Sequence, residues 1–259
     1  MNIRIKTTLI KSFYLLLLGG FIVSCASKKD VVLFQDVSNY ETIVNENTFI
    51  PKFKVDDLIS IYVSTFDPVA SAPFNLYQGS QENGIGAQQV DYLVNKDGNI
   101  DFPVIGKVSV VGLSSEELRE HLKEKLADYL KNPIINIRIK NFTVTVLGEV
   151  NRPGTYSVNG EEITILEALG LAGDMTIKGM RNNILVIRDF NGAKVYTKLD
   201  LTSKMVATSP AFYLTQNDVV IVEPNQSAVT ASSLDNRANI AISIASVLIT
   251  STVILLTRN

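Results

Sequence analysis

A 20-residue stretch without any charged side chain lies near the carboxyl end of the chain, between Arg237 and Arg258. A helix rises about 1.5 Å per residue, so this stretch reaches roughly 30 Å, the thickness of the hydrocarbon core of a bilayer. Because lipid offers backbone groups no hydrogen bonds, a spanning segment is regular and satisfies its own backbone. The sequence therefore predicts a transmembrane helix at residues 239–257, after a linker at residues 226–238.

The predicted helix carries polar side chains at spacings that place them along one side. Such a stripe suits the water-facing wall of a pore built from several copies. Ser and Thr also bond to backbone carbonyls of their own helix, and small residues let neighbouring helices approach, so packing is the alternative interpretation. The candidate pore-lining residues are Asn239, Ser243, Ser246, Thr250 and Thr257.

Charge and residue counts exclude several classes of protein. The formal net charge is −2, and three of the 24 Lys and Arg residues lie in an amino-terminal leader that contains no acids. The mature chain is therefore more acidic still, and nucleic acid is not expected as a partner. One cysteine excludes an internal disulfide, and one histidine excludes the usual structural zinc sites built from this chain alone. We expect no metal and no cofactor.

The amino-terminal leader has the order of a secretory signal, with basic residues first and an apolar run after them. Arg4, Lys6 and Lys11 precede the run Phe13–Val23, which is short for a bilayer span. Residues 1–24 are therefore predicted to be a signal peptide.

The only cysteine, Cys25, stands directly after this apolar run. The sequence Ile22-Val23-Ser24-Cys25 resembles a bacterial lipobox, which implies that Cys25 is acylated and becomes the first residue of a mature lipoprotein. The alternative is an ordinary signal peptide with an incidental cysteine. Residue 26 is Ala rather than the aspartate that retains many lipoproteins in the inner membrane, which favours the outer membrane. Residues 25–46 are expected to form an acylated tether to membrane lipid.

Residues 47–140 are predicted to form a first mixed domain. Alternating apolar residues predict half-buried strands, an Asp-Gly pair predicts a hairpin turn, and Ser with Glu three residues later predicts a capping box. The predicted elements are a strand at Leu58–Val63, a long loop or insertion at Ser64–Asp91, a hairpin of Tyr92–Val94 and Ile100–Phe102 around Asp97-Gly98, a helix from Ser114 to about Asn132, and a strand at Ile135–Ile139.

Residues 141–225 are predicted to form a second small α+β domain by the same signals, with a glycine placed to end its helix in the left-handed conformation. The predicted elements are a strand at Phe142–Val150, a turn at Asn151–Gly154, a strand at Thr155–Val158, a helix from Thr164 to about Ala172 ended by Gly173, a hairpin of Ile184–Arg188 and Val195–Leu199 around Asn191-Gly192, and a strand at Val219–Val222.

Three groups of titratable residues invite a catalytic interpretation. Asp56-Asp57 occupies a predicted turn, His121 lies on the predicted core helix, and Glu161-Glu162 precedes a capped helix. Each is expected to be solvated or to serve the fold. Without a Ser-His-Asp arrangement, phosphate loop or metal cluster, no catalytic residue is expected. Two carboxylates can in principle hydrolyse a glycoside, so an enzyme acting on polysaccharide stays open as an alternative.

Several long motifs resemble known domains. KDGNIDFP at residues 96–103, followed by Gly106-Lys107-Val108, resembles the export domain of the outer-membrane polysaccharide export lipoproteins, the family of capsule translocons. VLGEVNRPGTY at residues 146–156 resembles the soluble-ligand-binding β-grasp module that follows it. Further matching segments are Leu166–Leu169, Ala172-Gly173-Asp174, Asn217–Val220 and Val222-Glu223-Pro224.

The resemblance covers residues 31–224, with one departure: the family's usual Gly-Asp turn in the first domain is Asp56-Asp57 here. It implies an α+β fold class, with two small mixed domains, the export domain and a β-grasp-like domain, followed by one C-terminal transmembrane helix. It also implies a location in the bacterial outer membrane, with a lipid anchor and with the soluble domains in the periplasm.

The resemblance further implies a homo-oligomeric ring, typically octameric in the family, that exports capsular or exopolysaccharide across the periplasm and outer membrane. The ring is a passive conduit and not an enzyme. The implied partners are the polysaccharide cargo and an inner-membrane polysaccharide co-polymerase or chain-length regulator with a tyrosine kinase domain. The alternative function is a non-transporting envelope lipoprotein that binds glycan or a protein partner through its β-grasp domain.

Overall fold

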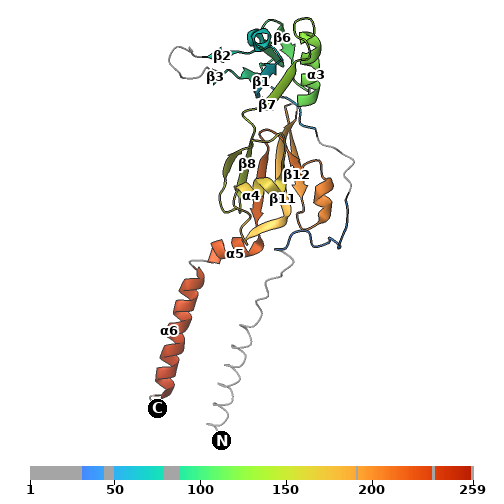
Figure 1. Ribbon diagram of the computed structural model, residues 1–259. Helices are drawn as coiled ribbons and strands as arrows, with labels where there is room; N and C mark the ends of the chain where they lie inside the picture. Colours follow the sequence, from blue (N-terminus) through green and yellow to red (C-terminus); the bar gives the residue numbers. More distant parts are fainter. Residues whose placement is uncertain (1–30, 44–49, 79–87, 191, 235–236, 258–259) are drawn as a thin grey trace.

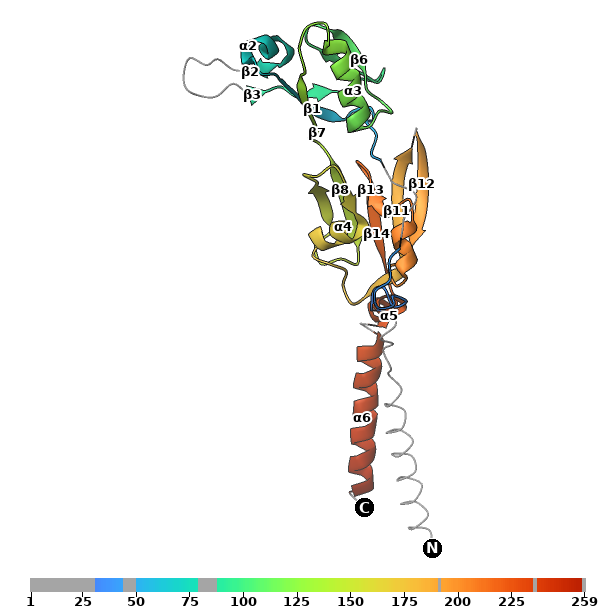
Figure 2. The same cartoon turned by 45° about the vertical axis from the view of Figure 1, so that its right-hand side comes forward.

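The computed structural model describes residues 31–43, 50–78, 88–190, 192–234 and 237–257. These residues form two mixed α/β domains that follow one another along an elongated molecule, and helix α6 extends from the end of the second domain (Figures 1 and 2). Each domain has its own apolar core, one built mainly from residues 53–137 and the other from residues 142–222. Only Ile139 packs, partly buried, against both described cores.

The first domain is a three-stranded antiparallel sheet covered by one helix. Strand β1 (Leu58–Ser64) lies between β4 (Tyr92–Leu93) and β7 (Ile134–Ile139), and helix α3 (Ser115–Leu126) contributes Leu118, Leu122 and Leu126 to the core. Apolar residues at every fourth position make one buried helical face. The smaller elements are α2 (Pro68–Ser71), a 3-10 turn (Ala72–Phe74), β2 (Tyr77–Gln78), β3 (Gln88–Gln89), β5 (Asn99–Phe102) and β6 (Gly106–Ser109).

Helix α3 begins as the sequence predicts and ends earlier. Ser114 Oγ accepts a hydrogen bond from Glu117 N at 3.1 Å, and Glu117 Oε2 accepts one from Ser114 N at 2.7 Å, so the capping box is confirmed. The helix stops at Leu126 rather than near Asn132. Leu130 is still buried, so the predicted apolar face is right at this position. The chain that leads to it after Leu126 forms turns rather than helix.

The predicted hairpin around Asp97-Gly98 is right in its turn and wrong in its pairing. Gly98 has φ +80°, and Asn95 N donates to Asn99 O at 2.9 Å across the turn. The flanking strands pair with other partners: β4 with β1, and β5 with β6. A turn signal is local, whereas strand pairing is decided by where each apolar face finds the core.

The second domain is a five-stranded sheet in the order β12-β11-β14-β8-β9, with the central β14–β8 pair parallel and the other pairs antiparallel. Helix α4 (Ile165–Leu171) buries Ile165, Ala168 and Leu169 in this domain's core. The strands are β8 (Thr143–Gly148), β9 (Gly154–Ser157), β10 (Ile163–Thr164), β11 (Gly179–Phe190), β12 (Ala193–Leu199), β13 (Tyr213–Leu214) and β14 (Val219–Pro224), and Lys204–Thr208 is a 3-10 helix.

Local signals in the second domain are confirmed at both ends of α4. Thr164 and Glu167 form the predicted capping box, and Gly173 follows the helix with φ +75°. Strand β8 ends at Gly148 rather than at Val150, because Gly148 has φ +88° and turns the chain. Glu149 N then donates to Val222 O at 3.0 Å, which keeps the chain against β14.

Helices α5 (Gln226–Leu234) and α6 (Arg237–Thr257) follow the second domain. The prediction of a C-terminal transmembrane helix at residues 239–257 is wrong: in the described part of the chain, no helix is both long enough and apolar enough to cross a membrane. The prediction counted residues between two arginines, and an uncharged interval is not an apolar one. Hydroxyl side chains interrupt this interval at Ser243, Ser246, Thr250, Ser251 and Thr252.

The turn Asp56-Asp57 and Asn141 tie the two domains together. Asp56 has φ +69°, so this residue takes the left-handed conformation that glycine adopts most readily. Asn141, just before β8, accepts a hydrogen bond from Leu58 N and donates one to Asp56 O, both at 2.9 Å. Asp57 is 2% exposed and accepts a hydrogen bond from Lys54 N at 2.8 Å. Both acids therefore serve the turn.

Replacing Gly148 with Ala is expected to unfold the second domain, because the added Cβ would lie 2.0 Å from the carbonyl oxygen of Val222. We expect a loss of about 3 kcal/mol or more in the free energy of unfolding. Gly192→Ala is the matched control: Gly192 has a similar φ of +80° and no atom within 4 Å of the added Cβ. It carries only the backbone strain of about 1 kcal/mol. Equal losses in chemical denaturation would contradict the predicted clash.

Replacing Asp57 with Asn is expected to stabilise the protein more at pH 7 than at pH 3. Burial raises the pKa of Asp57 above its usual value, whereas the hydrogen bond from Lys54 N acts against this shift. The stability that the protonated acid contributes is therefore present at low pH and lost as pH rises through the folded pKa. Denaturation midpoints at the two pH values measure the effect. Asp56→Asn, at the exposed neighbouring position, is the control, and a pH-independent difference for Asp57→Asn would contradict the assignment.

Candidate functional site

The predicted lipidation site, Cys25, lies outside the described residues, and the chain that follows it is held by the second domain. We call residues 32–41 the strap. Phe34 N donates to Leu201 O at 3.1 Å and Gln35 N donates to Thr202 O at 2.7 Å, while Leu33 and Phe34 pack on the core of the second domain. This part of the predicted tether is therefore docked on the folded protein.

Charged contacts fasten the strap further along. Asp36 accepts hydrogen bonds from Ser203 Oγ and Lys204 N, each at 2.6 Å, and Lys204 forms an ion pair with Glu41. The hydrogen bond from Ser203 lowers the pKa of Asp36, and the hydrogen bond from Lys204 lowers the pKa of Glu41. No sequence signal indicated this docking, because the partners are about 165 residues apart in the chain.

The candidate pore-lining residues lie on α6, where their hydroxyls bond to the helix itself. Ser246 Oγ donates to Ser243 O at 2.8 Å, and Thr250 Oγ1 donates to Ser246 O at 2.7 Å. This is the backbone bonding that the alternative interpretation expected. The side chains of Asn239 and Thr257 lie outside the described part of the structure. No finding tests the pore-lining role, which stays a prediction.

The two long motifs lie in different domains. KDGNIDFP forms the Gly98 turn and β5 in the first domain. VLGEVNRPGTY forms the end of β8, a turn and β9 in the second. In that turn Asn151 Nδ2 donates to Gly173 O at 2.7 Å and Arg152 Nη2 donates to Leu171 O at 3.2 Å. The motif residues at the turn therefore brace the end of α4.

A buried acid at the junction of the domains was not predicted as a site. Asp218 is completely buried and forms an ion pair with Arg188 at 2.7 Å. Thr215 donates to it from its backbone N at 2.7 Å and from Oγ1 at 2.9 Å. These contacts satisfy the carboxylate, as a buried charge requires.

Lys54 from the first domain completes this junction. Its Nζ donates to Thr215 Oγ1 at 3.2 Å and to Asp189 O at 3.4 Å. Burial lowers the pKa of Lys54, while the negative charge of Asp218 acts in the opposite direction. Together with Asn141, Lys54 fixes the first domain against the second. The sequence signal was present in the Asn217–Val220 motif, but it does not reveal the partner from the first domain.

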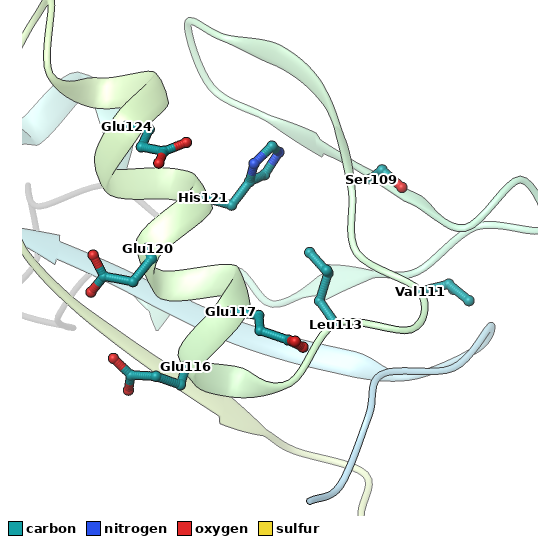
Figure 3. Close-up of a pocket in the computed structure, with 8 residues that line it drawn as sticks. All are labelled: Ser109, Val111, Leu113, Glu116, Glu117, Glu120, His121 and Glu124. Carbon is teal, nitrogen blue, oxygen red and sulfur yellow. The ribbon is translucent and has the colours of Figure 1, made fainter.

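A shallow cavity of about 540 Å³ lies beside α3 and contains the only histidine of the chain (Figure 3). Four glutamates accompany His121, and most have structural partners. Glu116 pairs with Arg119, Glu117 closes the capping box, and Glu120 pairs with Lys123. Figure 3 shows Glu116 and Glu120 on the side of the helix away from His121. Glu116, Glu117 and Glu120 therefore serve the helix.

The remaining acidic pair of the sequence analysis lies on the surface. Glu161 and Glu162 are exposed, and within the ranges that the structure covers no group of three or more His, Cys, Asp or Glu side chains could hold a metal ion. The arrangement is thus one of two joined domains, a docked strap and solvent-exposed acids.

Comparison with protein families gives two consecutive matches. Residues 51–140 match the family described as polysaccharide biosynthesis/export protein, and residues 143–222 match the SLBB domain. Both correspond to the domains that the motifs resemble. The first description is that of an export family and not of an enzyme family.

Two curated relatives carry the same name, EPS I polysaccharide export outer membrane protein EpsA. The protein from Ralstonia solanacearum is 31% identical over 141 residues, covering 52% of this chain and 36% of the relative. The protein from Ralstonia nicotianae is 31% identical over 147 residues, covering 54% of this chain and 38% of the relative. The matched part thus spans well under half the length of these relatives.

The names of the relatives support the prediction of a bacterial outer-membrane location for this protein. The two family matches together confirm the resemblance seen in the motifs, since they occur in the expected order along the chain. The chain therefore carries a polysaccharide biosynthesis/export protein domain, directly followed by an SLBB domain.

Proposed function

We propose that this protein assembles into an oligomeric channel at the outer membrane, through which a capsular polysaccharide or exopolysaccharide leaves the cell. The observation that carries the proposal is the unbroken succession of an export domain and an SLBB domain, at residues 51–140 and 143–222. Two relatives that are 31% identical to this chain are named as EPS I polysaccharide export outer membrane proteins. In this proposal the protein acts as a passive conduit and not as an enzyme.

The junction between the domains supports a role as a stiff building block. Lys54 and Asn141 bond across it, and Ile139 packs on both cores. Inter-domain motion is the usual expectation where an interface is small and unbonded. Here the bonded junction gives every copy the same angle between its two domains, so that many copies can pack side by side.

The edge of the second domain supports contact between copies. Strand β12 is the last strand on its side of the sheet, and it exposes Val195 and Tyr196, with Phe190 exposed on the neighbouring β11. An edge strand offers unpaired backbone groups, and exposed apolar side chains favour burial against a partner. We therefore assign this edge to the contact between neighbouring subunits of a homo-oligomeric ring.

The strap supports a lipid anchor close to the second domain. An extended chain spans at most about 3.6 Å per residue, so an acylated Cys25 would lie no more than about 22 Å from Val31. Acylation of Cys25 then holds the second domain near the membrane. The first domain, at the other end, faces the periplasm and an inner-membrane co-polymerase or chain-length regulator with a tyrosine kinase domain.

Deletion of the gene is expected to abolish surface polysaccharide while synthesis of precursor continues, because a conduit acts after synthesis. Staining of surface polymer and assay of intracellular precursor measure the two effects. Unchanged surface polymer in the deletion strain would overturn the proposal.

Re-expression of variants in that strain tests the anchor within the same experiment. Wild type and Ser24→Ala, which keeps a small residue before the cysteine, are expected to restore export. Cys25→Ala is expected to restore little, since the protein loses its acyl chains and with them its hold on the membrane. Full restoration by Cys25→Ala would show that acylation is dispensable.

The native mass of the acylated protein in mild detergent tests the ring. We expect one discrete multimer, because a single narrow chain cannot enclose a channel. Tyr196→Lys, which places a charge on the exposed edge of β12, is expected to reduce the multimer, whereas Tyr129→Lys, at an exposed tyrosine of the first domain, is the control. A monomer that persists across detergents and concentrations would favour the alternative of an anchored binding protein.

A further inference from the structure

A polar cavity of about 460 Å³ opens where the strap, the start of β11 and the start of α5 meet. Its size lies within the roughly 300–1,000 Å³ range of small-molecule sites. Amide, hydroxyl and carboxylate side chains surround it: Gln35 from the strap, Asn182 from β11, Asp200 and Thr202 after β12, and Gln226 and Ser227 from α5. Such a lining can both donate and accept hydrogen bonds around its whole rim.

The walls of this cavity are held by backbone contacts. The pairing of β11 with β14 shifts register between Gly179 and Ile184, and this irregularity leaves room for the residues that line the cavity. Gln35 N donates to Thr202 O at 2.7 Å, and Asn225 N donates to Lys178 O at 2.7 Å. The three walls are therefore fixed before any ligand enters, which lowers the cost of binding.

Arg181 lies at the wall of the cavity and is 7% exposed. Its Nη1 donates to Gly179 O at 2.9 Å and to Thr176 O at 3.2 Å, which holds the guanidinium in place. Among the described residues, Nε and Nη2 have no hydrogen-bond partner, and neither is one of the fully occluded polar atoms. No carboxylate among them forms a salt bridge with Arg181, so a buried positive charge keeps two donors for something that enters the cavity.

Asp200 provides a carboxylate oxygen that can accept a hydrogen bond from a ligand hydroxyl group. Its Oδ1 accepts hydrogen bonds from Thr202 N at 2.8 Å and Thr202 Oγ1 at 2.6 Å, which fixes the orientation of the carboxylate. The second oxygen, Oδ2, is left to accept from a ligand. The cavity thus combines three kinds of group. Arg181 is a cation with N–H donors, Asp200 is an acidic acceptor, and the side chains of Asn182 and Gln226 are neutral amides.

We propose that this cavity binds one acidic sugar residue of a polysaccharide, with Arg181 paired to the sugar carboxylate. Guanidinium groups pair well with carboxylates, since two N–H groups match two oxygens. The side chains of Asn182, Gln226 and Ser227 bond the ring hydroxyls, and Asp200 accepts from one of them. This site rests on the proposed export function for its polysaccharide, but its chemistry is that of the cavity alone.

The test measures binding of two matched probes to the full-length protein. Methyl β-glucuronide and methyl β-glucoside differ only in a carboxylate against a hydroxymethyl group. Saturation-transfer NMR detects the bound probe, and a zwitterionic detergent without a sugar headgroup avoids competition for the site. We expect the glucuronide to bind at least about tenfold more tightly than the glucoside, because the charged hydrogen bonds to Arg181 are lost with the glucoside.

Variants locate the binding. Ser227→Leu and Asn182→Leu place apolar atoms at the cavity and are expected to weaken glucuronide binding at least about tenfold, and Arg181→Met is expected to remove the preference for the acid. Ser232→Leu, on the same helix and outside the cavity, is the matched control and should bind as wild type. Ser227→Leu and Asn182→Leu keep the test valid if Arg181→Met fails to fold.

Equal binding of both probes, or binding that survives Ser227→Leu and Asn182→Leu, would overturn the proposal, as would failure of the glucuronide to bind at 10 mM. These outcomes are separate from the test of export. A wild-type protein that restores surface polymer but binds no glucuronide keeps its export function and loses only this site.

Discussion

The fully buried carboxylate of Asp218 is the interaction on which the arrangement of the molecule depends. A charge at this depth is tolerated only with partners, and Arg188 and Thr215 supply them from the second domain. Lys54 of the first domain donates a hydrogen bond to Thr215. Thr215, which bonds to the buried Asp218 in the second domain, therefore also contacts the first domain. Loss of Asp218 would remove the carboxylate that forms the ion pair with Arg188 and whose negative charge acts on Lys54. The stability of the second domain and the angle between the domains are therefore linked through one side chain.

The strap docks on the second domain at one short segment, residues 201–204. Its backbone bonds to Leu201 and Thr202, and its acids bond to Ser203 and Lys204, so one short segment of the second domain receives all of these contacts. That segment follows directly after edge strand β12. The end of edge strand β12, the docked strap and the wall of the polar cavity consequently lie next to one another. A change in one of them, such as removal of the strap, would disturb the other two.

Local patterns predicted the parts of the fold that depend on neighbouring residues. The capping boxes at Ser114 and Thr164 and the left-handed glycines at 98 and 173 were readable, since each acts within a few residues. The partners of β4 and β5, the docking of Asp36 and the reach of Lys54 were not readable, because they join segments far apart in the chain. The membrane helix was mispredicted from the absence of charge, whereas an apolar span depends on the whole side-chain surface. Motif resemblance succeeded because it compares many positions at once, and it still could not show that Arg181 lines a cavity.

Asp56 illustrates how a departure from a family pattern is absorbed. The left-handed conformation costs an ordinary residue about 1–2 kcal/mol, but Asp tolerates it better than most because its short polar side chain bonds locally. Here the carbonyl of Asp56 accepts a hydrogen bond from Asn141, and its neighbour Asp57 closes the turn by accepting from Lys54 N. The same turn carries Lys54 to the second domain. The left-handed residue therefore lies in a backbone turn that is held by hydrogen bonds on both sides.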